Sequence, residues 1–246
     1  MSDDLRSGTY GEDSQTIYDD LEGVSKVTSL PDDAPHRNVD ILVLKAGTEQ
    51  SDRIKTAIVC PSTIHGLGRG PSNKRSIQIP ALVRAILERG HGIQVGAGKT
   101  HWGNIHVHDL SDIYLKLVEN AAVGGSIAEW PGKPALWGEE GYYFGEAGEH
   151  VWGDVSQLVA TEAHKQDLIK TDEVKSLSEK EANECTQFGA MMWGGNSRPR
   201  GKRARVALKW EPKGPGVEEG IKAIVEVEAK DLGMKPGHAK IAAGEA

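Results

Sequence analysis

A loop between Pro61 and Gly68, with the sequence PSTIHGLG, holds the residues of this chain best suited to binding a ligand. The loop follows an apolar run at residues 54–59 that is rich in β-branched side chains and predicts a buried strand. Glycine lets the backbone approach a flat ligand closely, and proline makes the wall of such a site rigid. The pattern therefore favours a binding loop at the end of a strand, with an ordinary turn as the alternative.

His106 and His108 have the spacing best suited to a metal ion, because side chains two positions apart in a strand share one face. Asp109 is the only carboxylate or thiol at ligand spacing, and it precedes an apolar periodic segment that predicts a helix reaching Ala122. A carboxylate in that position is typical of an N-cap. We therefore expect no metal site, and a structural role for His106.

Short apolar segments separated by glycine and proline predict strands and helices that would position these residues. The segments with strand character are residues 54–59, 92–95, 104–107 and 141–145. The segments with helical spacing are residues 39–46, 77–88, 110–122, 149–164, 180–188, 200–208 and 217–232. Residues 39–46 are predicted to be a buried helix, with a strand as the alternative. The order predicts an α/β fold with buried parallel strands, and its aromatic core residues would be Tyr142, Tyr143, Phe144 and Trp152.

The composition excludes several classes of function. The formal net charge is −7 and the basic residues are dispersed among acidic ones, so no nucleic-acid partner is expected. The one basic cluster, at residues 198–205, is predicted to be a solvent-exposed helix start. No apolar run approaches the ~18 residues that span a bilayer, so no membrane partner is expected either.

Cysteine usage and the first residues favour a reducing compartment. Cys60 and Cys185 lie far apart and form no C-x-x-C motif, which argues against a disulfide framework or a cysteine zinc site. Residues 1–15 are acidic and polar, and they lack the basic and apolar regions of a signal peptide. We therefore expect a cytoplasmic location.

Three segments, in order along the chain, resemble motifs of one protein family. They are the loop at residues 61–68, WGNIHVHDL at 102–110, and the run from WGGNSR at 193–198 through RAR at 203–205 to LKWEP at 208–212. These motifs resemble those of the extended short-chain dehydrogenase/reductase superfamily, also called the NAD-dependent epimerase/dehydratase family. The resemblance covers residues 7–232. The resemblance implies NAD or NADP as cofactor. It also implies oxidation, reduction, epimerisation or dehydration of a small hydroxylated or carbonyl substrate.

The resemblance also implies site residues, because in that family the strand end and its proline pack beside the nicotinamide ring. The implied cofactor contacts are Pro61, Ser62, Thr63 and Ile64. The implied substrate contacts are His65, Arg75, Gln78 and Arg198. The guanidinium group of arginine suits a carboxylate or phosphate. A solvated surface position is an equally good interpretation for Arg75, and a partly exposed loop position is the alternative for His65.

Two features of the family are absent from the sequence. One is the G-x-x-G-x-x-G loop that admits the cofactor pyrophosphate, and the other is a Y-x-x-x-K pair in which the lysine acidifies a proton-exchanging tyrosine. Family order places Ser7 at a strand end where a serine commonly orients the substrate, and it places the Tyr and Lys positions near Asp32 and His36. These three residues are the catalytic candidates. A turn and a helix start are the simpler interpretation of Asp32 and His36.

The resemblance therefore implies the remnant of a Rossmann-like extended short-chain dehydrogenase with its C-terminal substrate-binding lobe. Residues 1–70 would be the end of the NAD(P)-binding domain, residues 71–232 mainly the substrate-binding lobe, and residues 233–246 a flexible tail. We expect the isolated chain to bind cofactor poorly and to be catalytically impaired. A non-catalytic ligand-binding or regulatory module is the alternative. Helix faces left bare by a missing lobe would favour a homodimer.

Overall fold

The computed structural model describes residues 9–125, 134–235 and 237. Its helices are α1 Val24–Thr28, α2 Arg37–Glu49, α3 Gln78–Arg89, α4 Val107–Ala122, the 3₁₀ helix η2 Gly138–Glu140, α5 Trp152–Lys165, α6 Glu179–Cys185, α7 Gly189–Gly194, α8 Lys202–Ala207 and α9 Val217–Asp231. Its strands are β1 Tyr18–Asp19, β2 Ile58–Pro61, β3 Thr63–His65, β4 Gly92–Val95, β5 His101–His106, β6 Tyr142–Gly145, β7 Gly148–Val151, β8 Val174–Leu177 and β9 Pro199–Arg200. The prediction of an α/β fold is confirmed.

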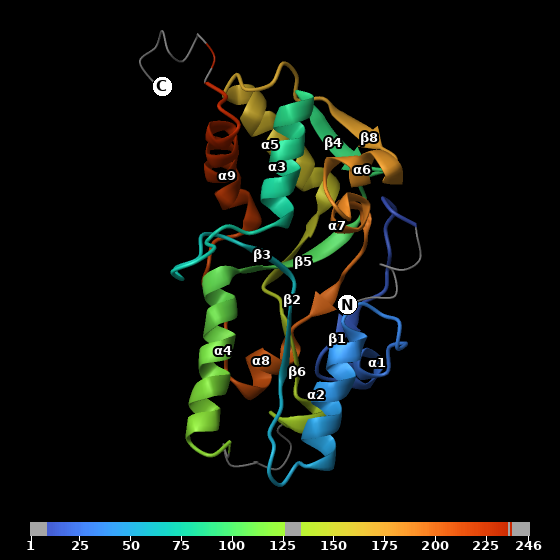
Figure 1. Cartoon of the computed structure of the whole chain (residues 1–246), viewed down its shortest axis with the longest axis vertical. Helices are drawn as coiled ribbons and strands as arrows, with labels where there is room; N and C mark the ends of the chain where they lie inside the picture. The colour runs from blue at the N-terminus through green and yellow to red at the C-terminus, as the bar shows by residue number, and fades with distance from the viewer. Residues whose placement is uncertain (1–8, 126–133, 236, 238–246) are drawn as a thin grey trace.

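Most strand pairs are parallel. β2 pairs with β6, β3 with β5, β4 with β8 and β1 with β9, all in parallel, whereas β7 runs antiparallel along the other edge of β5. Figure 1 shows α3, α5 and α9 gathered beside β4, which we call the α3–α5–α9 body. It shows α2, α4 and α8 around β2 and β6, which we call the α2–α4 body. The β3–β5–β7 sheet lies between the two bodies and connects them.

Each body has its own hydrophobic core. In the α3–α5–α9 body one large cluster includes Ile86, Val159 and Val225, which are completely buried. In the α2–α4 body the apolar side chains divide into two smaller clusters, and the buried aromatic residues of β6 belong to them. Trp152 is buried in the larger cluster, so the predicted aromatic core is confirmed.

The predicted helices are present with shifted ends, and α2 confirms the helical interpretation of residues 39–46. α5 begins at Trp152 rather than at residue 149, because residues 148–151 pair with β5 as β7. The predicted strand at residues 54–59 forms only from Ile58, where the chain meets its partner Tyr142 in β6. β3 and β8 were not predicted, since both are short and their stability comes from pairing with strands far away in sequence.

The N-cap prediction for Asp109 is wrong. His106 is the N-cap of α4, and its Nδ1 accepts a hydrogen bond from the backbone N–H of His108 at 3.3 Å. The Asp109 carboxylate instead accepts backbone N–H groups of Lys213 and Gly214 at 2.9–3.1 Å. Asp109 therefore fixes the segment that leads into α9.

The basic cluster at residues 198–205 is not a solvent-exposed helix start as predicted. Arg203 is completely buried, and its Nε donates to the backbone carbonyl of Asp20 at 2.8 Å. The Asp20 carboxylate accepts the backbone N–H of Arg203 at 2.8 Å. These contacts tie the N-terminal segment to α8, so the cluster is a structural junction.

The proposed domain boundary at residue 70 stays a prediction. Tyr18 and Phe144, from either side of it, share one hydrophobic cluster. Residues 1–8 and residues 236 and 238–246 of the predicted tail lie outside the described residues. Within the described ranges, no helix has the length and apolar character needed to cross a membrane.

Candidate functional site

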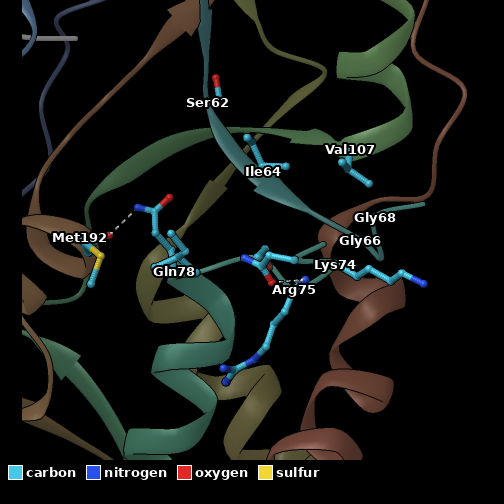
Figure 2. A pocket seen from close by; sticks show the side chains of 12 residues that line it. Ser62, Ile64, Gly66, Gly68, Lys74, Arg75, Gln78, Val107 and Met192 are labelled. Carbon is cyan, nitrogen blue, oxygen red and sulfur yellow. Dashed lines mark hydrogen bonds between the residues drawn. The ribbon is translucent and has the colours of Figure 1, made fainter. Parts of the chain in front are cut away.

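A cavity of about 380 Å³ lies where β3 faces the start of α3. Its walls come from four parts of the chain, as Figure 2 shows for most of the side chains. The lining residues are Ser62, Ile64, Gly66, Gly68, Asn73, Lys74, Arg75, Ser76, Ile77, Gln78, Val107 and Met192. The volume falls within the range typical of small-molecule sites.

Alternation along the strand decides which loop residues reach this cavity. Ser62 and Ile64 line it, whereas Thr63 is buried on the other side and donates its hydroxyl hydrogen to Gln78 Oε1 at 2.9 Å. Pro61 ends β2 opposite Gly145 and does not line the cavity. The Ser62 hydroxyl is buried and has no hydrogen-bond partner among the described residues. In Figure 2 this oxygen points away from the other labelled side chains, so the hydroxyl is not exposed to the cavity.

Gln78 connects two walls of the cavity. Its Oε1 accepts from Thr63, and its Nε2 donates to the backbone carbonyl of Met192 at 3.4 Å, as the dashed line in Figure 2 marks. The Gln78 carbonyl in turn accepts the indole N–H of Trp193 at 3.2 Å. Strand β3, helix α3 and helix α7 are thereby held at a fixed separation around the cavity.

The segment at residues 66–76 closes the cavity on the side of α9. Gly66 has a φ of 85°, and a side chain there would collide with the His106 ring, so only glycine fits. The N–H of Gly68 donates to the Lys74 carbonyl at 2.9 Å, which closes the segment into a loop. The loop brings the backbone of residues 73–76 to the cavity just before α3 begins.

The entrance to α3 favours an anionic ligand group. The first N–H groups of a helix have no acceptor within the helix, and they carry a partial positive charge. Lys74 is exposed at the same edge of the cavity. The Arg75 guanidinium, however, extends away from Gln78 in Figure 2 and donates to Glu228 on α9. Its charge is therefore used in an ion pair.

His65 lies on the opposite side of β3 from Ile64 and does not line this cavity. It is only 4 % exposed, so the alternative of a partly exposed loop position is wrong, because β3 pairs here with β5. Its ring meets that of His106 edge to face, with 5.4 Å between the centroids. Burial, and secondarily the nearby His106, lowers the pKa of His65 to about 4, so its ring is neutral at neutral pH.

Arg198 does not line the cavity and lies in an ion-pair network around Glu149. Its Nε and Nη2 donate to the two Glu149 oxygens at 3.1 and 2.9 Å, and Arg200 adds a third bond at 2.9 Å. Burial alone would raise the pKa of Glu149, but the two arginines hold it at about 2. Arg198 therefore belongs to an ion-pair network that links β7 to β9.

Two of the three catalytic candidates, Asp32 and His36, do not line the cavity. Asp32 and His36 are both exposed, and within the part of the chain that the structure describes they form no hydrogen bond with each other. His36 is the N-cap residue of α2, with a φ of 62°. Ser7 lies outside the described residues. Over those residues no group of three or more histidine, cysteine or carboxylate side chains could hold a metal ion.

Comparison with known proteins identifies the family. No protein-family model matches the chain. The oxidase ucsJ of an Acremonium species is 38 % identical over 232 residues, which is 94 % of this chain and 67 % of that protein. The chain belongs to the extended short-chain dehydrogenase/reductase superfamily.

Two solved structures of dTDP-glucose 4,6-dehydratases share the fold of this superfamily member. The enzyme from Bacillus anthracis, in complex with NAD, matches with a TM-score of 0.54 and 15 % identity over 91 % of this chain. The enzyme from Streptomyces venezuelae, with NAD and TYD bound, matches with a TM-score of 0.53 and 14 % identity over 92 % of it. The chain spans 59 % and 58 % of the lengths of these two enzymes.

Several cavity residues of this superfamily member were not predicted from the sequence. Lys74, Ser76 and Ile77 come from the loop before α3, and Met192 comes from α7. The polar run directly before the predicted helix start at Ile77 was the available signal for Lys74 and Ser76. Met192 directly precedes the WGGNSR motif, but only the contact between α7 and Gln78 places it in the cavity.

Proposed function

We propose that this chain forms the substrate-facing side and one wall of the nicotinamide site of an NAD(P)-dependent oxidoreductase or epimerase/dehydratase. Its substrate would be a small hydroxylated or carbonyl compound. The observation that carries the proposal is the cavity beside β3, which Ser62 and Ile64 line. These two residues belong to the loop that matches the family motif for the nicotinamide side.

The residues present fit the nicotinamide end of such a cofactor. Ile64 and Val107 offer apolar contact to a flat ring. NAD or NADP, when bound, would accept or supply the hydride. Gln78 holds the walls apart, and the start of α3 with Lys74 favours a negatively charged group of the substrate or cofactor.

The sequence contains neither the phosphate-binding loop nor the Y-x-x-x-K pair, so we expect no hydride transfer by this chain alone. The measurement is the oxidation of NADH and NADPH by pure protein in the presence of a panel of aldehydes and ketones. Turnover that scales with protein concentration would contradict this expectation. The second candidate is a non-catalytic ligand-binding module, and binding in the cavity of a ligand other than a reduced nicotinamide would favour it.

A titration with reduced nicotinamide mononucleotide tests the proposed wall directly. Trp193 hydrogen-bonds Gln78, so a bound reduced nicotinamide would quench its fluorescence. We expect saturable quenching in the native chain and its loss in Ile64→Tyr, where the larger side chain fills the cavity. Val118→Tyr, on the exposed face of α4, is the matched control and should bind as the native chain does. Equal quenching in Ile64→Tyr and in the native chain would exclude this cavity as the site.

A further inference from the structure

A second cavity, of about 500 Å³, lies between the segment at residues 66–76 and helix α9. His65 lines it, whereas Ile64, the preceding residue of β3, lines the first cavity. Gly66 and residues 74–76 contribute to both, so this short segment separates the two cavities. A ligand in the second cavity therefore does not need to occupy the first cavity.

Most of the wall of the second cavity is aliphatic. The aliphatic lining residues are Leu67, Pro80, Pro215, Val217, Ala223, Ile224 and Val227. Such a wall suits the apolar body of a small molecule, because burying it removes apolar surface from water. The few polar groups then decide which apolar molecules are recognised.

Glu228 is the most unusual of these polar groups. It lines the cavity from α9 and is 0 % exposed. Its Oε1 accepts from the Arg75 guanidinium, but its Oε2 has no hydrogen-bond partner among the described residues. A buried acceptor without a donor is costly, so a ligand that supplies the donor gains from this site. Since Arg75 already neutralises the carboxylate, a neutral hydroxyl suits this oxygen better than an ammonium group.

The histidine rings add polar contacts on the facing wall. His65 forms no hydrogen bond through its ring within the described part of the chain, and a neutral ring offers one donor and one acceptor. His106 accepts a hydrogen bond at Nδ1, which places the proton of its neutral ring at Nε2. Both rings line the cavity opposite α9.

We propose that this second cavity binds a small, mainly aliphatic alcohol, whose hydroxyl donates to Glu228 Oε2 and whose body packs against α9. The site requires neither a cofactor nor the first cavity, so it extends beyond the function proposed above. The 66–76 segment forms part of both cavities, and an alcohol bound here contacts the loop that precedes α3.

Gly220 offers a way to close the site without disturbing the core. A Cβ at Gly220 would meet only Ile224 Cδ1, at 3.9 Å, so a large side chain fits into the cavity from the helix surface. Replacement of a glycine inside a helix also favours the helical state. Gly220→Trp and Ala223→Trp therefore fill the cavity from two adjacent positions. Lys222→Trp is the control, because Lys222 lies on the same helix but outside the cavity.

The test uses methyl NMR spectra of the full chain, titrated with 2-cyclohexylethanol and with its methyl ether, which has no donor. We expect the alcohol to shift the Ile224 and Val227 methyl signals, and to bind at least about fivefold more tightly than the ether. Both blocking variants should lose these shifts while Lys222→Trp keeps them, with native spectra elsewhere confirming that each variant is folded. Equal affinity for alcohol and ether would overturn the role of Glu228. Shifts that survive in a folded blocking variant, or no shifts in the native chain, would overturn the site.

Discussion

Helices α2 and α3 are similar in length and in aliphatic content, but they pack in opposite ways. α3 buries most of its apolar side chains, among them Leu82, Val83 and Ile86. α2 buries only Arg37, Asp40 and Gly47, whereas Val39 and Leu42 are 53 % and 68 % exposed. The residues that α2 buries are thus mainly polar or small. Packing against the core therefore does not account for the apolar side chains of this helix.

Helix α4 resembles α2 in this respect. Its inner face buries Ile113 and Leu117, but Tyr114, Leu115 and Val118 on its outer face are exposed. The α3–α5–α9 body thus encloses most of its apolar residues, with Leu158 and Val227 as exposed exceptions, whereas the α2–α4 body presents a larger part of them to solvent. Exposed apolar faces of this kind are typical of protein–protein contact surfaces. This difference supports the proposal of a homodimer or of another protein surface against the α2–α4 body.

The largest expected effect is in the enclosed core. Ile86→Ala removes buried methylene groups and leaves a cavity, so it should lower the free energy of unfolding by about 2–5 kcal/mol. Leu42→Ala on α2, a similar truncation, should change it by less than about 0.5 kcal/mol. Urea unfolding of both variants measures the contrast. A loss of several kcal/mol in Leu42→Ala would show that the exposed face of α2 is part of a core.

The sheet between the two bodies should make stability depend on pH. Burial lowers the pKa of His65 to about 4 and that of His150 to about 3, each from an ordinary value near 6.5. As the pH falls, these histidines therefore bind protons at a higher pH in the unfolded chain than in the native one. Stability consequently falls as the pH drops from about 6.5 towards 4. Burial of Asp20 raises its pKa to about 6 and offsets part of this loss, because native Asp20 binds its proton first.

His65→Gln isolates the histidine contribution. The free energy of unfolding should decrease between pH 7 and pH 4.5 in the native chain. We expect the decrease to be smaller in this variant, by roughly 1–3 kcal/mol. Parallel urea titrations at the two pH values give this difference. An identical pH dependence in both proteins would mean that His65 is protonated equally in the folded and unfolded chain.

The Glu149 network should have an effect of intermediate size. Glu149→Gln removes the charge partner of Arg198 and Arg200 and should cost about 1–2 kcal/mol at neutral pH. In the native chain this contribution is present above the unfolded pKa near 4.5, and it is lost as pH falls towards about 2. The difference in unfolding free energy between the two proteins should therefore be smaller at pH 3 than at pH 7, without disappearing. A constant difference would contradict the ionic origin.

The smallest effect on stability is expected from charging the exposed helix face, where only association should change. Leu42→Lys places a charge on the apolar face of α2 and should weaken self-association with a stability change within about 0.5 kcal/mol. Sedimentation velocity at several concentrations compares the variant with the native chain. A native chain that is monomeric at all concentrations would contradict the homodimer proposal.

The helices were the most predictable part of this fold. The spacing of Leu82, Val83 and Ile86 predicted both α3 and its buried face, because a local apolar period decides both. For α2 the apolar run predicted a buried helix; the helix is confirmed, but its predicted burial is wrong, because Val39 and Leu42 are exposed. Burial of this helix depends on residues far away in sequence.

The site was only partly predictable. The loop motif indicated Ser62 and Ile64, and the strand alternation that separates them from Thr63 and His65 became visible only with the pairing of β3 and β5. Arg75 and Arg198 looked like ligand contacts, but their carboxylate partners Glu228 and Glu149 are 153 and 49 positions away. Ion pairs over such separations leave no local sequence signal.

The central claim is that this chain supplies a wall for the nicotinamide end of the cofactor and no site for the pyrophosphate. The most direct test compares the affinities of NADH and reduced nicotinamide mononucleotide for the native chain by tryptophan quenching, with Ile64→Tyr as the negative control. We predict affinities within about threefold of each other, because the extra half of NADH would find no contacts. NADH binding more than about tenfold tighter, a gain of about 1.4 kcal/mol, would contradict the claim and reveal a phosphate site in this chain.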